Sequence, residues 1–126
     1  MEIEKARKII SDNYNCNENS FVYCLYEKCY FSIEKFWEYY ESIASFVGVN
    51  EKNAEITREI TDSYQRILKE IIFHFDPMDL AVMDNFPENY TDYIERIDYA
   101  LLAYYTGNLD LLDNEKFELQ RWISVW

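Results

Sequence analysis

Apolar residues recur at intervals of three and four along most of the chain, which is the spacing of one face of an α-helix. The longest such segment opens at Asn50 and ends near Phe75, and its apolar face carries Ile60, Ile67 and Ile72 as well as Phe75. The same spacing recurs in shorter segments between polar stretches. Together these segments predict six or seven helices, over residues 2–12, 21–28, 33–47, 50–75, 77–84, 92–105 and 113–122.

Residues that start and stop helices stand at the ends of these segments. Ser20, Ser32 and Thr91 precede apolar runs, where a hydroxyl side chain caps the first free N–H groups of a helix. Gly48 and Gly107 follow such runs, where a residue in the left-handed conformation ends a helix. The chain has 2 glycines and 2 prolines, too few for the closely spaced turns of a β-sandwich or barrel. The sequence therefore predicts an all-α fold, a single compact domain that spans residues 1–126.

Composition narrows the classes of protein to which the chain can belong. Hydrophobic residues make up 49% and aromatic residues 18% of the sequence, far more than in a disordered acidic tail. Acids outnumber bases 24 to 12, and a net charge of −12 disfavours binding to nucleic acid or to an anionic membrane surface. The charged N-terminus lacks the apolar stretch of a signal peptide, and the longest strongly apolar run, near residues 100–105, is too short to cross a bilayer. We therefore expect a cytoplasmic protein with no nucleic-acid or membrane partner.

Residues that carry catalytic or metal chemistry are scarce. Cys16, Cys24 and Cys29 form an odd set without a Cys-x-x-Cys pair, which predicts reduced cysteines rather than a disulfide framework. His74 is the single histidine and lies far along the chain from the cysteines, so we expect no closed metal site. A nucleophilic pair of Cys29 with His74 has no further support in the sequence, and two isolated glycines cannot form a phosphate-binding loop. We therefore expect no metal, no cofactor and no enzymatic activity.

Negative charge is concentrated in the last half of the chain. Residues 1–75 hold 13 acids and 9 bases, whereas residues 76–118 hold 11 acids and 2 bases. Like charges repel one another in a folded protein, and solubility alone requires only a modest net charge placed anywhere. This concentration indicates a surface that attracts a basic partner.

The predicted helix over 92–105 places part of this charge beside tyrosine. Positions 92, 95, 96 and 99 share a face opposite the apolar stripe of that helix, so Asp92, Glu95 and Tyr99 are expected to point outward together. Tyrosine is enriched at protein interfaces because it combines a large contact area with a polar tip. The candidate partner-binding residues are Asp84, Glu88, Asp92, Glu95, Asp98 and Tyr99.

A small, acidic, tyrosine-rich helical chain with reduced cysteines and no catalytic motif resembles the immunity proteins of bacterial polymorphic toxins. These include the immunity proteins of contact-dependent growth inhibition and of colicin-type systems. The resemblance covers the character of the whole chain and rests on no diagnostic motif, so it assigns no residue a role. It implies a cytosolic protein that binds one cognate toxin domain, often a basic nuclease, with acidic side chains in place of nucleic-acid phosphates.

A second function stays open beside the first. An acidic helical chaperone or adaptor, which binds an amphipathic segment of a partner protein, has the same composition. An exposed apolar groove and stable homodimerisation would favour the adaptor, whereas a monomer, or a dimer that leaves a convex acidic patch free, would favour the inhibitor. An enzyme is the third and least supported alternative.

Overall fold

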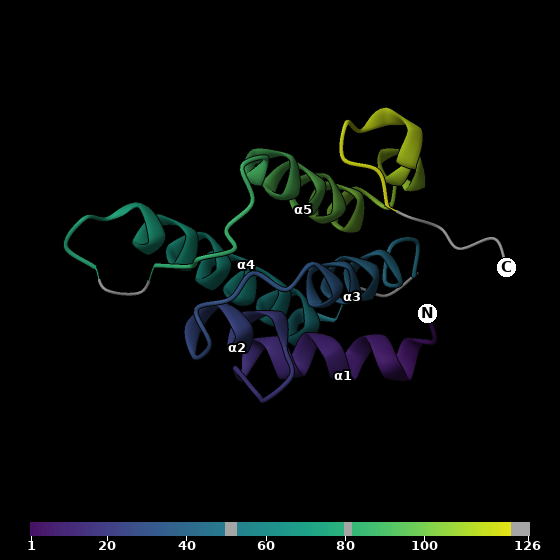
Figure 1. Ribbon diagram of the computed structural model, residues 1–126. Helices are drawn as coiled ribbons and strands as arrows, with labels where there is room; N and C mark the ends of the chain where they lie inside the picture. The colour runs from purple at the N-terminus through teal and green to yellow at the C-terminus, as the bar shows by residue number, and fades with distance from the viewer. Residues whose placement is uncertain (50–52, 80–81, 122–126) are drawn as a thin grey trace, which may run out of the picture.

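The computed structural model describes residues 1–49, 53–79 and 82–121, and every regular element within them is helical (Figure 1). Five α-helices and two short 3-10 helices (η) make up this part of the chain: α1 (Ile3–Tyr14), α2 (Phe21–Tyr26), α3 (Ile33–Ala44), α4 (Ala54–Phe75), α5 (Tyr90–Thr106), η1 (Leu109–Leu112) and η2 (Asn114–Lys116). The predicted all-α fold is confirmed, with fewer α-helices than the six or seven expected.

Local capping chemistry starts and ends several of these helices as predicted. The Ser20 hydroxyl accepts a hydrogen bond from the backbone N–H of Tyr23 at 3.1 Å, and the Ser32 hydroxyl accepts one from Lys35 at 3.2 Å. Each bond satisfies one of the N–H groups that have no partner in the first turn of a helix. Gly107 ends α5 in the left-handed conformation, with φ of 74°. Gly48 is also left-handed, with φ of 82°, but the helix predicted to run up to it ends earlier, at Ala44.

The start of α4 differs from its prediction. The helix begins at Ala54, and the side chain of Asn53 caps it by accepting from the backbone N–H groups of Glu55 and Ile56. Asn50, the predicted start, lies outside the described residues.

The short helix predicted over residues 77–84 is wrong for the residues that the structure describes there, and residues 80–81 lie outside them. The Asp76 side chain accepts from the N–H of Met78 at 2.9 Å and its backbone carbonyl from Asp79 at 3.0 Å, which closes a turn. Farther on, the N–H of Met83 donates to Nδ1 of His74 at 3.0 Å. The backbone donors that a helix would use are thus bonded to a turn and to the end of α4.

The predicted start of α5 at Thr91 is also wrong. The helix begins at Tyr90, and its N-terminal flanking residue, Asn89, makes no side-chain capping bond. The Tyr90 ring packs on Phe75 and Phe86, with ring centroids 5.1 and 5.3 Å apart. Packing with the end of α4 therefore determines where α5 begins, and the Thr91 hydroxyl lies inside the first turn.

The last helix, predicted over 113–122, is replaced by η1 and η2, and residue 122 lies outside the described part of the chain. Asn108 accepts from the N–H of Asp110 at 3.0 Å, and Asp113 accepts from Glu115 at 3.1 Å. Two short side-chain caps five residues apart interrupt the ladder of an α-helix. The chain is extended again at Phe117.

The helices enclose a core in which α3 is central. α1 packs against α3 and α4, and α5 packs against α3 and η1. Figure 1 shows α1 and α5 on opposite sides of α3. Phe21, Phe31, Phe36 and Tyr93 meet at the centre, with ring centroids 4.8 to 6.3 Å apart. α5 and the segment after it, residues 90–121, therefore form an outer layer, which we call the α5 layer.

None of the described helices combines the length and the apolar character that crossing a bilayer needs.

Candidate functional site

The predicted partner-binding residues lie on α5 and on the loop that leads into it. Asp84 and Glu88 are exposed on the loop, and Glu95 is exposed on α5. Tyr99 is 39% exposed, so it faces outward as predicted. Asp92, also predicted to face outward, is partly buried.

Tyr99 and Glu95 lie together against the C-terminal segment. The Tyr99 ring makes an edge-to-face contact with Phe117, with centroids 5.3 Å apart. Glu95, Tyr99, Lys116 and Phe117 line a small cavity of about 110 Å³ with Leu111. The packing on Phe117 covers part of the Tyr99 ring, and the rest of the side chain stays exposed.

Asp98 contacts α4, whereas Glu95 and Tyr99 lie against the C-terminal segment. Its carboxylate accepts a hydrogen bond from the hydroxyl of Tyr64 on α4. Burial, together with this acceptor, raises the pKa of Tyr64, because the neutral hydroxyl is the form that donates. Asp98 therefore ties α5 to α4, in addition to facing solvent.

Two further hydroxyl contacts join the same helices. Thr57 bonds the hydroxyl of Tyr104 at 2.7 Å, and Thr61 bonds that of Tyr105 at 2.8 Å. These contacts and the Tyr64–Asp98 bond hold one side of α5 on α4. The outer side of α5 is thereby carried on a fixed support, as a binding surface requires.

Ion pairing divides the molecule into two parts. Arg7, Lys8, Lys35 and Arg66 each pair with an acid of α1, α3 or α4. Among the 11 acids of residues 76–118, leaving Asp79 aside, none forms an ion pair with any residue that the structure describes. Residues 1–75 hold 9 bases for 13 acids, and several of these form ion pairs. The acids of residues 76–118, leaving Asp79 aside, form none within the described chain.

The two bases of residues 76–118 form no ion pair with these acids. Arg96 is 2% exposed, and Lys116 is exposed and donates to the backbone carbonyl of Asp110 at 3.1 Å. We call the uncompensated carboxylates of this segment the acidic surface. It comprises Asp84, Glu88, Asp92, Glu95, Asp98, Asp110, Asp113, Glu115 and Glu118.

The prediction that Arg96 shares the outward face of α5 is wrong. Its guanidinium lies over the rings of Trp37, Tyr40 and Phe117, 5.1, 4.7 and 4.1 Å from their centroids. Residue 96 lies three positions after the buried Tyr93, so it borders the apolar side of the helix. A charged side chain can occupy that side because aromatic rings cover its guanidinium.

The end of α4 presents an apolar surface that the sequence pattern did not predict. Ile72 and Phe75 were predicted to face inward, but they are 63% and 53% exposed. Figure 1 shows this end of α4 projecting beyond its neighbours, and its last turn packs on the chain that follows it, with the rings of Phe75 and Phe86 5.4 Å apart. We call the exposed apolar residues here the α4 tip, which comprises Ile72, Phe73, Phe75, Met78 and Val82.

The three cysteines and His74 are partly buried among their neighbours. Burial raises the pKa of the Cys16 and Cys24 thiols, which disfavours the reactive thiolate. The His74 ring stacks on Phe86 with centroids 4.2 Å apart, in addition to accepting from Met83. Over residues 1–49, 53–79 and 82–121, no three His, Cys, Asp or Glu side chains are grouped so that they can hold a metal ion.

The chain was compared with protein-family models, curated proteins and solved structures, and nothing matches it. The resemblance to immunity proteins therefore stays a prediction from the character of the sequence.

Proposed function

We propose that this protein is a cytoplasmic inhibitor of the immunity type, which binds a basic toxin domain through the acidic surface. The observation that carries the proposal is the distribution of ion pairs. Five of the nine acids of the first four helices pair with bases of those helices, whereas the structure shows no ion pair for the acidic surface within the described residues. A partner that supplies lysines and arginines provides the missing counter-charges.

Exposed apolar side chains on the α5 layer support the same proposal. Leu102, Tyr105 and Leu109 are 47%, 43% and 60% exposed, and Tyr99 adds a fourth side chain. Protein interfaces combine an apolar or aromatic centre with a polar rim, and tyrosine is enriched in the centre. These four residues are suited to the centre, and the carboxylates around them to the rim.

A toxin that cuts nucleic acid has a basic active-site surface, because it must bind phosphates. Carboxylates presented on a fixed helix layer resemble the negatively charged phosphates of nucleic acid, and the toxin cannot cleave them. Opposite potentials also accelerate encounter, which an inhibitor needs to act before the toxin does. Inhibition by this route requires binding alone and no catalytic residue.

The test measures binding to a basic toxin domain, which is sought in the adjoining gene because a toxin gene is the expected neighbour of an immunity gene. Glu88→Lys combined with Glu95→Lys reverses two exposed carboxylates for which the structure shows no ion pair. We expect the association rate to fall about 10-fold or more and the salt dependence to weaken. The matched control is Glu2→Lys with Glu4→Lys on exposed residues of the α1 end, which should leave the rate within a factor of about 2.

A second candidate function, the adaptor, is favoured by one specific observation, the α4 tip. Met78 is 87% exposed and Ile72 63%, and contiguous exposed apolar side chains mark binding surfaces for protein segments. In this case Ile72→Glu with Met78→Glu should abolish binding to an amphipathic partner helix. If that pair of changes abolishes binding while the Glu88 and Glu95 reversals have no effect, the adaptor replaces the inhibitor.

A further inference from the structure

A cavity of about 530 Å³ lies between the start of α3, the start of α5 and the segment that follows η2. Ile33 and Trp37 line it from α3, Tyr93 from α5 and Leu119 from the C-terminal segment. Pockets for small molecules have volumes of roughly 300–1,000 Å³, with mostly apolar and aromatic walls and a few polar groups. This cavity has the size and the apolar surface of such a pocket.

The aromatic part of the wall is held in place by the core. Tyr93 makes edge-to-face contacts with Phe31 and Phe36, with ring centroids 5.0 and 4.8 Å apart. Trp37 contacts Phe36 and Tyr40 in the same way, at 5.0 and 5.4 Å. Aromatic rings attract cations as well as apolar groups. The wall therefore offers a fixed surface for a ligand that has both characters.

One carboxylate in the wall has no counter-charge, whereas the other charged groups there are paired. Glu38 pairs with Lys35 at 3.2 Å, and Arg121 pairs with Glu41. Glu34 also lines the cavity, is exposed, and forms no ion pair with a described residue. The wall thus carries one uncompensated negative charge.

Two further charges lie next to the aromatic side chains. The Arg96 guanidinium lies over the Trp37 ring, 5.1 Å from its centroid. Burial and, to a smaller extent, the nearby carboxylate of Asp92 raise the pKa of Tyr93. The charges of Arg96 and Asp92 offset each other, so Glu34 determines the sign of the ligand. A monocation balances Glu34, whereas an anion is repelled by it and by the net charge of −12.

The Tyr93 hydroxyl supplies a hydrogen-bonding group that the protein leaves without a partner. Tyr93 is 7% exposed, and the structure shows no hydrogen bond between its hydroxyl and any described residue. Polar groups as buried as this are hydrogen-bonded almost without exception, so an orphan group indicates a ligand or water. A phenol oxygen accepts from an N–H donor. A cation that carries N–H groups meets this requirement, and a quaternary ammonium ion does not.

We propose that this cavity binds a small primary amine in its protonated form. The ammonium group has Glu34 as its counter-charge and the Tyr93 hydroxyl as an acceptor. The apolar part of the amine packs on Trp37 and Leu119. Charge-assisted hydrogen bonds of this kind are stronger than those between neutral groups.

The cavity borders the acidic surface, because Tyr93 follows Asp92 and Leu119 follows Glu118 in the chain. The proposal does not rest on the inhibitor function, since the ligand is a free amine. The experiments use the protein alone, so their outcome is the same whether or not a toxin binds.

The first experiment titrates the purified full chain by calorimetry with 2-phenylethylamine hydrochloride, 2-phenylethanol and sodium phenylacetate at pH 7. These three probes share a phenyl ring and differ in charge. We expect saturable one-to-one binding of the amine, tighter by about 10-fold than that of the neutral alcohol, and no saturable binding of phenylacetate. Bound amine should also raise the melting temperature by mass action. Equal binding of the alcohol or of phenylacetate, or no saturable binding of the amine, overturns the proposal.

The second experiment changes the two polar groups of the site. Glu34→Gln removes an exposed charge, so it should leave the fold intact and weaken amine binding about 5-fold. Tyr93→Phe removes only the hydroxyl and keeps the ring in the core, and it should weaken binding by a similar factor. If both variants bind 2-phenylethylamine like the wild type, the cavity is not the site.

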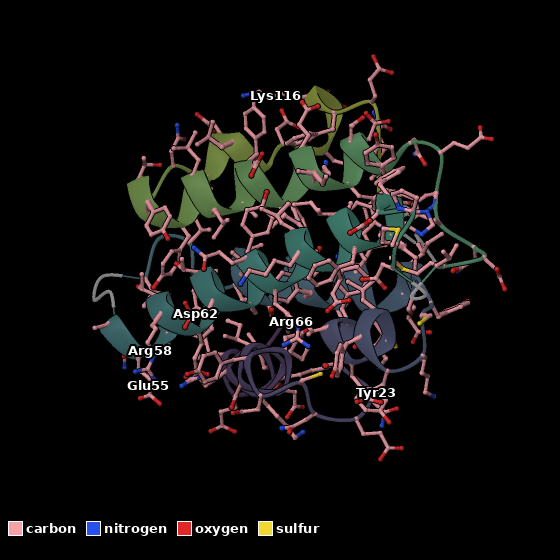
Figure 2. The ribbon with its side chains drawn as sticks, turned by 90° about the vertical axis from the view of Figure 1, so that its left-hand side faces the viewer. Tyr23, Glu55, Arg58, Asp62, Arg66 and Lys116 are labelled. Atoms are coloured by element: carbon pink, nitrogen blue, oxygen red, sulfur yellow. The ribbon has the colours of Figure 1, made fainter. Side chains whose placement is uncertain are left out.

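The matched control removes a carboxylate elsewhere. Asp62 is exposed on α4 (Figure 2), and it lines a different cavity together with Tyr14 at the end of α1. Asp62→Asn changes the net charge as Glu34→Gln does, but it should bind 2-phenylethylamine with the wild-type affinity. Equal loss in Asp62→Asn and Glu34→Gln would indicate a non-specific effect of net charge and contradict the proposal.

Discussion

The buried carboxylate of Glu59 on α4 forms an ion pair with Arg7 on α1. Glu59 is 3% exposed, and both of its carboxylate oxygens accept from Arg7 at 2.9 and 2.8 Å. This two-point pairing uses the planar fork of arginine, which lysine cannot reproduce. Glu55 adds a second, exposed carboxylate 3.3 Å from the same guanidinium.

Removal of Arg7 should therefore leave a buried charge without a partner. We expect Arg7→Ala to lower the free energy of unfolding by about 2–3 kcal/mol, below the upper range for buried pairs because Arg7 is partly exposed. Urea unfolding followed by circular dichroism measures the change. Lys8→Ala, which removes an exposed pair with Asp12, is the control and should change stability by less than about 0.5 kcal/mol. Equal effects of the two substitutions would show that Glu59 does not need Arg7.

Buried tyrosines predict how stability depends on alkaline pH. Burial raises the pKa of the hydroxyls of Tyr39, Tyr40, Tyr64 and Tyr93 above the ordinary value of about 10. Below pH 10 both folded and unfolded chains keep these protons, so the full stabilisation is present. Above it the unfolded chain releases them first, so stability falls as pH rises.

The measurement is a spectrophotometric titration of tyrosinate alongside the helical circular dichroism signal. We expect these four of the 12 tyrosines to ionise only as the helical signal is lost. Ionisation of all tyrosines near pH 10 with the helices intact would contradict the assigned burial.

At the scale of elements, substitutions near the N-termini of helices distinguish the contribution of local capping bonds from that of tertiary packing. Ser20→Ala and Ser32→Ala should each lower the free energy of unfolding by about 1 kcal/mol, because each removes an acceptor from a first-turn N–H. Thr91→Ala should change it by only a few tenths of a kcal/mol, because Thr91 lies inside the first turn of α5 and caps nothing. Denaturant unfolding of the three variants measures the effects, and a loss of about 1 kcal/mol in Thr91→Ala would restore the predicted cap.

The elements that the sequence predicts best are those whose boundaries are decided by neighbouring residues. Ser20, Ser32 and Gly107 act on backbone groups within a few positions of themselves, so their roles are visible in the sequence. Tyr90 begins α5 because its ring meets Phe75, a residue fifteen positions earlier. Such a contact depends on the fold already being formed, so the capping pattern alone placed the start of α5 at the wrong residue.

For the candidate site too, the sequence predicts what depends on one helix alone and not the contacts between distant segments. Glu95 and Tyr99 point outward as helical periodicity requires. The Tyr64–Asp98 bond joins residues 34 positions apart, and the rings around Arg96 come from α3 and from the C-terminal segment. Helical periodicity assigns residues to the faces of a helix, but it does not show which charged side chain aromatic residues from other segments will enclose.

At the scale of the whole molecule, the acidic surface should reduce stability. Its carboxylates repel one another, and none of them forms an ion pair with a described base, so part of the folding free energy is lost to repulsion. We expect Glu88→Lys with Glu95→Lys to raise the free energy of unfolding by about 0.5–1 kcal/mol at low salt. Sodium chloride should stabilise the wild type more than this variant.

Urea unfolding of both proteins at low and high sodium chloride tests this expectation. Destabilisation of the variant would contradict it, because the carboxylates would then be structural rather than kept for a partner. The outcome is separate from partner binding, which the same two substitutions should weaken.

The measurement that tests the central claim most directly is amide hydrogen exchange of the chain with and without the basic toxin domain that we propose as its partner. The account predicts that the toxin slows exchange in the loop around Glu88, on α5 around Tyr99 and in η1 and η2, while exchange in α1 is unchanged. The protection should weaken as salt increases, because the contact depends on opposite charges. Protection confined to the α4 tip or to α1, with exchange in the α5 layer unchanged, would contradict the claim that the acidic surface binds the partner.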